Sequence, residues 1–298
     1  MKTATSVKAR IKNRADKEKR NVQDMFILYV LERVLYRLSL SPYKDNFVLK
    51  GGCLLYGVFN EQYARTTTDI DLLGIRISNE SEYMKKIFAD VLSVECDDAI
   101  RFDINSLSAR NITEFKEYHG VNVSVIAYLD RTRVPVNIDI GYNDVIYPRE
   151  QVMEYPTILD DEPPILNAYS LESIIAEKFE AIVSLGVVNS RYKDFYDIYT
   201  LAHRFDFSGK ELLEAIIETF EHRKTTLEKI AAFEEGFADD AYRKGRWKGF
   251  IKTKRADTDL SLDETIAFIR TFLEPIVTAI NNGKRFDKLW NHSNASWD

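Results

Sequence analysis

The chain has 298 residues, of which 45% are hydrophobic, so it can bury a substantial core as one large domain or two ordinary ones. Its 41 basic and 47 acidic residues give a net charge of −6, which is not typical of proteins that coat nucleic acid nonspecifically. Cys53 and Cys96 lack metal-ligand spacing, and neither a signal-peptide segment nor an apolar run long enough to span a bilayer is present. We therefore expect a reduced, cytoplasmic protein without a membrane segment.

The first 20 residues are strongly basic. They contain Asp16 and Glu18 against eight Lys or Arg residues, namely Lys2, Lys8, Arg10, Lys12, Arg14, Lys17, Lys19 and Arg20. A solvated, frayed helix is the simpler interpretation, and a basic arm that holds RNA is the alternative. Residues 21–39 follow with a helical stripe of apolar side chains, which indicates packing.

A buried strand is predicted at Phe47–Leu49, followed by Gly51 and Gly52 at the start of an apolar helix. Glycines at a helix N-terminus allow backbone N–H groups to approach a phosphate. Lys50, at the end of the strand, is either a phosphate ligand or a solvated loop lysine. The stretch therefore predicts a nucleotide-binding turn.

Two carboxylates, Asp69 and Asp71, lie two positions apart on the next predicted strand, so both project from one face. Neighbouring carboxylates repel each other unless a cation lies between them, and oxygen ligands of this kind suit Mg²⁺ together with substrate phosphates. Arg65 precedes the pair and either contacts a triphosphate or neutralises the acidic residues. The pair predicts a magnesium ion and a nucleotide together.

Three further strands are predicted at 101–107, 121–129 and 134–141, after a helix near 78–94. In the last strand Asp139 lies on the face opposite the apolar side chains. Ionised carboxylates are seldom buried without a partner, so Asp139 is a candidate third metal ligand, and an edge-strand Asp that faces water is the alternative.

A connector with several prolines at 147–164 indicates a domain boundary near residue 150, and we expect a helical domain at 151–298. Lys178 lies within the apolar stripe of the first helix of that domain, where it either extends to the edge or meets a charged ligand. On the next helix Asp194 and Asp197 share one side, and Arg191 can pair with Asp194.

The last hundred residues repeat the amphipathic helical pattern without a chemical motif. Basic residues surround Trp247 and Phe250, a segment suited to RNA or to an acidic partner, although mixed-charge helices often have this composition by chance. Residues 283–298 are expected to be loosely structured. None of the four histidines has a convincing partner for a zinc site or a catalytic triad.

Five sequence motifs resemble, in order, those of nucleotidyltransferase toxins of the AbiEii type, relatives of the MenT toxins within the DNA polymerase β-like superfamily. The motifs are Gly51-Gly52, Asp69-Ile70-Asp71, Asn137-Ile138-Asp139-Ile140-Gly141, Ala176-Glu177-Lys178 and Arg191-Tyr192-Lys193-Asp194-Phe195-Tyr196-Asp197. The resemblance implies an α+β fold, with a polymerase β-like nucleotidyltransferase domain of mixed sheet and helices at 1–150 and an α-helical domain at 151–298. The second domain would contribute Lys178 and Asp194 to the cleft.

The resemblance also implies a reaction, the transfer of NMP from an NTP to an acceptor hydroxyl with release of pyrophosphate. Mg²⁺ would be bound by Asp69 and Asp71, with Asp139 as the candidate third ligand. The catalytic set would consist of Asp69, Asp71, Lys178 and Asp194. The nucleotide-binding candidates are Lys50, Gly51, Gly52, Cys53, Arg65 and Arg191. Cys53 replaces the Ser or Thr that commonly follows the glycines, and a thiol is a weaker hydrogen-bond donor to phosphate.

The expected acceptor is a tRNA 3′ end, in a toxin–antitoxin or phage-defence setting with a cognate antitoxin protein. Two other functions remain open. A small-molecule nucleotidyltransferase, for example one that modifies an aminoglycoside, would use the same metal site with an acidic acceptor pocket. A catalytically silent binding protein with this fold would show no NTP turnover.

Overall fold

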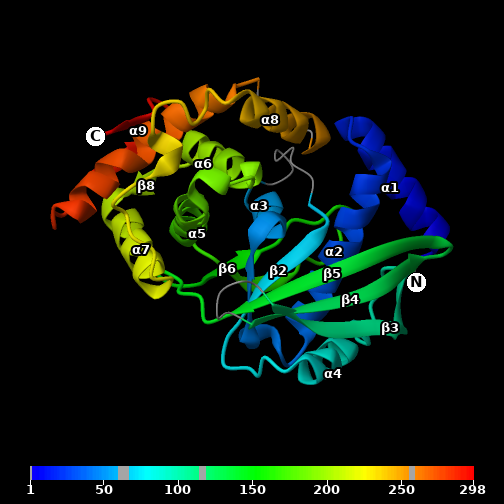
Figure 1. The fold of residues 1–298 in the computed structure, drawn as a ribbon. Helices are drawn as coiled ribbons and strands as arrows, with labels where there is room; N and C mark the ends of the chain where they lie inside the picture. The colour runs from blue at the N-terminus through cyan, green and yellow to red at the C-terminus, as the bar shows by residue number, and fades with distance from the viewer. Residues whose placement is uncertain (1, 60–66, 114–118, 255–258) are drawn as a thin grey trace. The chain divides into compact units, whose positions relative to one another are not determined.

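The computed structural model describes residues 2–59, 67–113, 119–254 and 259–298. The chain forms two compact units, and Figure 1 colours the ribbon by residue number from blue at the N-terminus to red at the C-terminus. The sheet unit comprises Met1–Asn143 and Gln151–Ala168, and the helical unit comprises Asp144–Glu150 and Tyr169–Asp298. Among the described residues, no helix combines the length and the hydropathy needed to cross a membrane.

The sheet unit contains a seven-stranded mixed sheet within the described residues, with strand order β3-β4-β5-β2-β1-β7-β6. Strand β2 pairs in parallel with β5, and β1 pairs in parallel with β7, while the other neighbours are antiparallel. The strands are β1 (Phe47–Lys50), β2 (Asp69–Gly74), β3 (Ile100–Thr113), β4 (His119–Leu129), β5 (Thr132–Tyr142), β6 (Gln151–Glu154) and β7 (Ile165–Ala168). The helices are α1 (Ala4–Glu18), α2 (Val22–Leu40), α3 (Gly51–Phe59) and α4 (Ser81–Leu92), with a 3₁₀ turn at Lys44–Asn46.

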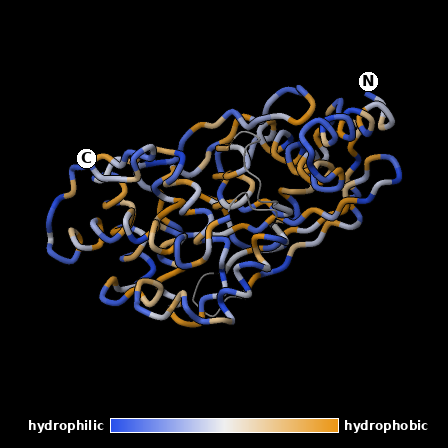
Figure 2. Tube along the Cα trace, turned by 90° about the horizontal axis from the view of Figure 1, so that it is seen from above, coloured by the Kyte–Doolittle hydropathy of each residue, from blue (hydrophilic) through white to orange (hydrophobic). Residues whose placement is uncertain are grey.

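One face of the sheet is apolar and buried, and the other carries polar side chains. Along β4 the buried positions are Val121, Val123, Val125, Ala127 and Leu129. Helix α4 packs against β3 and β4, and α2 packs against β5. Hydrophobic and hydrophilic residues alternate along the chain trace in Figure 2, as expected for strands with one face in a core. The sheet therefore buries one face in the core and carries its polar side chains on the other.

Strands β6 and β7 lie within the stretch that the sequence indicated as a connector. They pair with each other and, through β7, with β1, so Gln151–Ala168 belongs to the sheet unit, whereas the expected boundary was at residue 150. Each strand has four residues, and most of β6 is exposed. Such short strands beside prolines carry no recognisable period-two pattern.

The basic N-terminal segment is a packed helix and not a frayed one. Val7, Ile11 and Ala15 of α1 are buried, and the side chain of Thr3 caps the helix by accepting a hydrogen bond from the N–H of Ser6. Helix α1 packs against α2. The apolar positions at i, i+4 and i+8 form one stripe, and the charged residues flank it.

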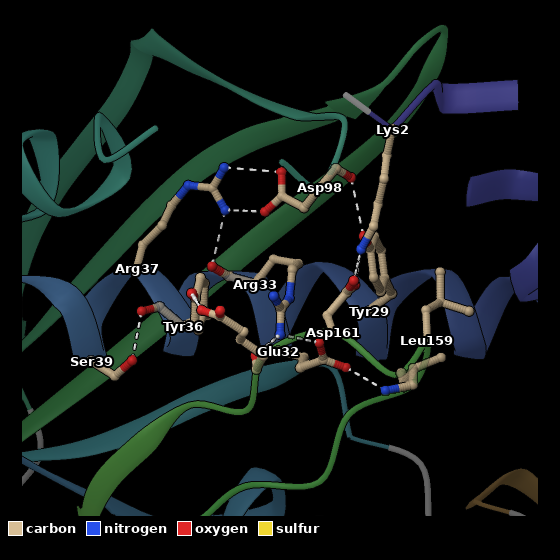
Figure 3. A network of polar contacts seen from close by, with 12 residues as sticks. Lys2, Tyr29, Glu32, Arg33, Tyr36, Arg37, Ser39, Asp98, Leu159 and Asp161 are labelled. Atoms are coloured by element: carbon tan, nitrogen blue, oxygen red, sulfur yellow. Dashed lines mark hydrogen bonds and ion pairs between the residues drawn. The ribbon is translucent and has the colours of Figure 1, made fainter. Parts of the chain in front are cut away.

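A buried network of charged residues connects α2 to the loops on either side of it (Figure 3). Arg37 donates to both carboxylate oxygens of Asp98, at 2.5 and 3.1 Å. The backbone N–H of Ile158 donates to Glu32 Oε2 at 2.6 Å, and Arg33 pairs with Glu32 at 2.5 Å. Burial nevertheless raises the pKa of Glu32 above its ordinary value, because desolvation exceeds the opposing effect of Arg33.

The helical unit contains α5 (Leu171–Leu185), α6 (Tyr192–Arg204), α7 (Gly209–His222), α8 (Ala241–Lys254) and α9 (Leu262–Asn281). A small antiparallel sheet joins β8 (Phe207–Ser208), β9 (Leu289–Asn291) and β10 (Ser296–Trp297) in the order β10-β9-β8. The end of the chain is thus ordered, contrary to expectation. Trp290 is fully buried, and its Nε1 donates to the carbonyl of Ala202 at 2.6 Å.

The aromatic residues of the basic segment in α8 belong to the core of the helical unit. Trp247 is 2% exposed, packs edge-on against Tyr192 and donates from Nε1 to the carbonyl of Leu260. Phe250 packs against Tyr196. Because Trp247 is buried by these contacts, its ring cannot stack on an RNA base, whereas a binding role for the basic residues of α8 stays a prediction.

Candidate functional site

The turn between β1 and α3 brings the helix N-terminus against a carboxylate. Gly51 has a φ of +69°, a conformation that side chains with a Cβ rarely adopt. A Cβ at Gly51 would also overlap the carboxylate of Asp71. Glycine is therefore required here for two reasons, backbone conformation and close approach. The arrangement places the first, unsatisfied N–H groups of α3 near the acidic positions of β2.

Strand β2 supplies the carboxylate pair. Asp69 and Asp71 lie on one face, and Ile70 between them is fully buried on the other. Thr68 donates from its hydroxyl to Asp69 Oδ2 at 3.2 Å. The strand geometry follows from alternating polarity in the sequence, and it holds both carboxylates on the polar face.

Strand β5 adds a third carboxylate beside the pair. Asp139 lies directly opposite Asp71 in the parallel β2–β5 register, and Asn137 lies opposite Asp69. On the other side, Asn122 of β4 is the cross-strand partner of Asp139 and donates from Nδ2 to Asp139 Oδ1 at 2.7 Å. Asn122 is 8% exposed, so this contact fixes one Asp139 oxygen. Asn122 was not among the site residues predicted from the sequence.

The donor set suits a magnesium ion that shares its ligands with a substrate. Within the described residues, no group of three or more His, Cys, Asp or Glu side chains is arranged to hold a metal ion. Mg²⁺ is commonly bound by one or two carboxylates, with waters and substrate phosphates completing its shell. Asp69 and Asp71 supply such a pair, and the Asp71 carboxylate lies against the glycine turn. The carboxylates fit a metal that arrives with a nucleotide better than a permanently caged one.

Lys50 is the cross-strand partner of Asp71 in the antiparallel β1–β2 pair, so the two side chains lie on the same face.

The position of Cys53 differs from the prediction. Its side chain is fully buried, with Sγ 3.2 Å from the hydroxyl of Tyr155, and burial raises its pKa to about 12. The thiol therefore faces the core of the sheet unit and not a nucleotide, which corrects the expectation for this side chain. Arg65 lies outside the described residues.

A second charged cluster lies within the helical unit. Lys178 of α5 contacts Asp197 Oδ2 at 2.6 Å and Asp194 Oδ1 at 3.3 Å, and Arg191 contacts Asp194 Oδ2 at 2.7 Å. Both aspartates are fully buried, whereas 12% of the Lys178 side chain is exposed. Asp194 also lies in the first turn of α6, where the helix dipole favours a negative charge. Each of these carboxylates is thus paired with a cation.

Two solved structures resemble the fold of the chain. One is a proposed nucleotidyltransferase from H. pylori, matched over 89% of this chain and 99% of that one, with a TM-score of 0.53 and 15% identity. The other is JHP933 from Helicobacter pylori, matched over 88% of this chain and 94% of that one, with a TM-score of 0.52 and 15% identity. No curated protein sequence matches the chain. At this identity the likeness shows the fold alone.

The family is shown by the sequence. The family described as the nucleotidyl transferase AbiEii toxin of type IV toxin–antitoxin systems matches residues 33–282, which include both charged clusters. The α+β architecture and the carboxylates on the mixed sheet agree with a polymerase β-like nucleotidyltransferase fold. The chain therefore belongs to the AbiEii family of nucleotidyltransferase toxins.

Proposed function

We propose that this protein is a Mg²⁺-dependent toxin that transfers NMP from an NTP to an acceptor hydroxyl and releases pyrophosphate. The observation that carries the proposal is the register of β2 and β5, which sets Asp71 beside Asp139 next to the glycine turn of α3. Adjacent carboxylates raise each other's energy in the absence of a cation. The electrostatic stabilisation of such carboxylates is therefore largest when a metal ion binds together with a phosphate.

The residues of the sheet unit have separate roles in this proposal. Gly51 and Gly52 allow the triphosphate to approach the N–H groups at the start of α3, and Lys50 contributes positive charge on the same face. Asp69 and Asp71, with Asp139, would hold Mg²⁺. When bound, the ion would polarise the α-phosphate and neutralise the charge that develops on pyrophosphate. Asn122 keeps the Asp139 carboxylate in one orientation.

Lys178, Asp194 and Arg191 are assigned to the same reaction through their match to the family motif. Their mutual ion pairs support an ordered arrangement of these side chains within the helical unit. The proposed acceptor is a tRNA 3′ end in the cytoplasm, and the proposed partner is the cognate antitoxin implied by the family. A small-molecule acceptor and a silent binding protein are the outcomes that the experiment must separate from this one.

The experiment incubates the purified protein with total tRNA, Mg²⁺ and each α-labelled NTP in turn, and then separates RNA, protein and small molecules. An Asp71→Ala variant tests the site, and Asp16→Ala removes an exposed carboxylate of α1 as a matched control. Label in tRNA with the unmodified protein and the control, but not with Asp71→Ala, supports the proposal. Label on protein or on an added aminoglycoside changes the acceptor. Absence of label in all fractions would favour the silent binder.

A further inference from the structure

The face of the sheet that bears the carboxylates continues as a strip of polar side chains across β3, β4 and β5. At the far end, Tyr128 of β4 lies between Arg101 of β3 and Arg133 of β5 in the strand register. The Arg101 guanidinium lies 4.7 Å from the centre of the Tyr128 ring. An aromatic ring flanked by two arginines thus occupies one end of this polar strip.

The middle of the polar strip consists of small hydrogen-bonding groups. Ser108 and Ser124 are cross-strand partners whose hydroxyl oxygens lie 2.9 Å apart, and Asn137 lies opposite Ser124 on β5. The next residue in this row is Asp69 of β2. Between this row and Tyr128 lies one row with Ile126 on β4 and Pro135 on β5, so the strip runs from the Tyr128 end to the carboxylates with one apolar row in it.

Arg110 lies at the edge of the row that contains the metal-binding candidates. It is the cross-strand partner of Asn122, which in turn faces Asp139 and, beyond it, Asp71. From Asn122 to Tyr128 the strip runs six residues along β4, or about 20 Å at the usual rise of about 3.3 Å per residue. A ligand that covers this length is longer than a single nucleotide.

The polar strip is positively charged away from the carboxylates. Arg101, Arg110 and Arg133 are exposed, and none of them forms an ion pair with another residue that the structure describes. Asp103 lies on the same face opposite Ile126, so these four residues carry a net charge of +2. Core packing does not account for this face, because the helices α2 and α4 pack with the apolar face of the same strands.

We propose that the polar strip binds the single-stranded 3′ end of an RNA acceptor. Tyr128 stacks on a base, Arg101 and Arg133 contact phosphates, and the terminal hydroxyl reaches Asp71 and Asp139. This inference rests on the proposed function, because it supplies the acceptor to the same site. Single-stranded RNA is commonly bound by aromatic rings beside cationic side chains, and hydroxyl and amide groups such as Ser124 and Asn137 can bond to the 2′-OH.

An acidic polypeptide is the other ligand that three arginines attract. The observations favour RNA because the aromatic ring and the hydrogen-bonding row point along one line toward the carboxylates. Those carboxylates would repel an acidic peptide that followed the same path. An RNA 3′ end places its phosphates beside the arginines at one end of the strip and a neutral hydroxyl beside the carboxylates at the other, so it is complementary to the charge at both ends.

The test measures fluorescence anisotropy of a labelled eight-nucleotide single-stranded RNA in Mg²⁺ without NTP, at several salt concentrations. Tyr128→Ala should weaken binding about 5- to 100-fold, the loss expected for one stacked base, whereas Tyr128→Phe should bind nearly as well as the unmodified protein. The double variant Arg101→Ala and Arg133→Ala should lower the slope of log K against log salt by about 1 to 2. The matched control, Lys85→Ala with Lys86→Ala, removes two exposed charges from α4 and should change neither quantity.

Unchanged RNA binding in Tyr128→Ala and in the double arginine variant, with circular dichroism confirming a folded protein, would overturn the inference. So would loss of binding to polyglutamate with RNA affinity retained, since the strip would then serve an acidic partner. The proposed function itself is tested separately, by measuring label transfer from NTP into tRNA. Tyr128-dependent RNA binding without any label transfer would retain the strip as an RNA site and reject the enzyme.

Discussion

The two charged clusters of this protein use the same residue types in opposite ways. In the helical unit Asp194 and Asp197 are fully buried, and each contacts a cation. In the sheet unit Asp71 and Asp139 are cross-strand neighbours of the same sign, and the partner that Asn122 offers to Asp139 is a neutral amide. In the helical unit each carboxylate contacts a cation that the structure describes, whereas in the sheet unit carboxylates lie next to each other and Lys50 is the cross-strand neighbour of Asp71.

The difference indicates what each cluster does for the molecule. A buried carboxylate that has a cationic partner is strongly destabilising only when that partner is removed. Repulsion between adjacent carboxylates destabilises the folded state, and a bound metal ion relieves that repulsion. We therefore expect substitutions in the sheet-unit cluster to act on activity, and substitutions in the helical-unit cluster to act on stability.

The largest effect is expected for Asp71→Asn. The variant should lose about 1,000-fold in the rate of label transfer, about 4 kcal/mol of transition-state stabilisation, because the carboxylate proposed to hold Mg²⁺ becomes an amide. Its thermal midpoint should change little, since relief of the repulsion with Asp139 opposes the lost attraction to the neighbouring Lys50. Transfer rate and differential scanning calorimetry check the two parts, with Asp16→Asn as the control. An active variant, or an inactive one that is also unfolded, contradicts the comparison.

Lys178→Met should have the opposite profile. Removing the ammonium leaves Asp194 and Asp197 buried with less compensation, and the free energy of unfolding should fall by about 3 kcal/mol. Urea denaturation measures this loss, and Lys210→Met at an exposed position of α7 should leave the midpoint within error. If Lys178→Met is as stable as the control but inactive, Lys178 acts only in the reaction. The assignment of stability to the helical-unit cluster would then be wrong.

Gly51→Ala and Gly186→Ala separate backbone strain from crowding of the site. Both glycines have positive φ, +69° and +51°, so backbone strain should cost about 1 kcal/mol in each variant, and the overlap with Asp71 should add to this loss at Gly51. Only at Gly51 would the new methyl group meet Asp71, whereas nothing lies near the added atom at Gly186. Nucleotide binding, measured by calorimetry, should weaken in Gly51→Ala alone. Equal weakening in both variants would mean that backbone strain, and not contact with the Asp71 carboxylate, determines the nucleotide affinity.

The parts of the site that could be predicted are those that depend on local periodicity. Asp69 and Asp71 share a face because strand side chains alternate, and Asp194 meets Arg191 because helical neighbours lie three residues apart. The individual strands and helices and the glycine turn follow from similar short-range patterns, whereas the polymerase β-like α+β fold was implied by the resemblance of five motifs to the AbiEii family. These features needed no knowledge of how distant strands pair.

The remaining features depend on register and on tertiary burial. Asp71 and Asp139 are 68 positions apart, and only the β2–β5 pairing makes them neighbours. The burial of Cys53 against Tyr155 depends on the direction in which α3 packs, which a Gly-Gly start does not specify. The same holds for the buried Trp290, whose three-residue strand gives no periodic signal.

Glu32 extends the comparison to a buried carboxylate in the sheet unit, outside the site, and has the smallest expected effect. Desolvation raises its folded-state pKa above the ordinary value of 4.5, so the folded state binds the proton more tightly than the unfolded state. The free energy of unfolding should therefore decrease as pH rises from about 4.5 through the raised pKa, by at most about 1.4 kcal/mol per pH unit. Glu32→Gln keeps an acceptor for the N–H of Ile158 and should remove this slope.

Urea denaturation at a series of pH values compares Glu32→Gln with Glu82→Gln, an exposed position on α4 that should retain the slope of the unmodified protein. If Glu32→Gln is less stable than the unmodified protein at every pH, the pairing with Arg33 outweighs desolvation. Glu32 would then resemble the balanced carboxylates of the helical unit. A slope that disappears only in Glu32→Gln would instead identify Glu32 as a buried carboxylate whose charge destabilises the folded state despite its contact with Arg33.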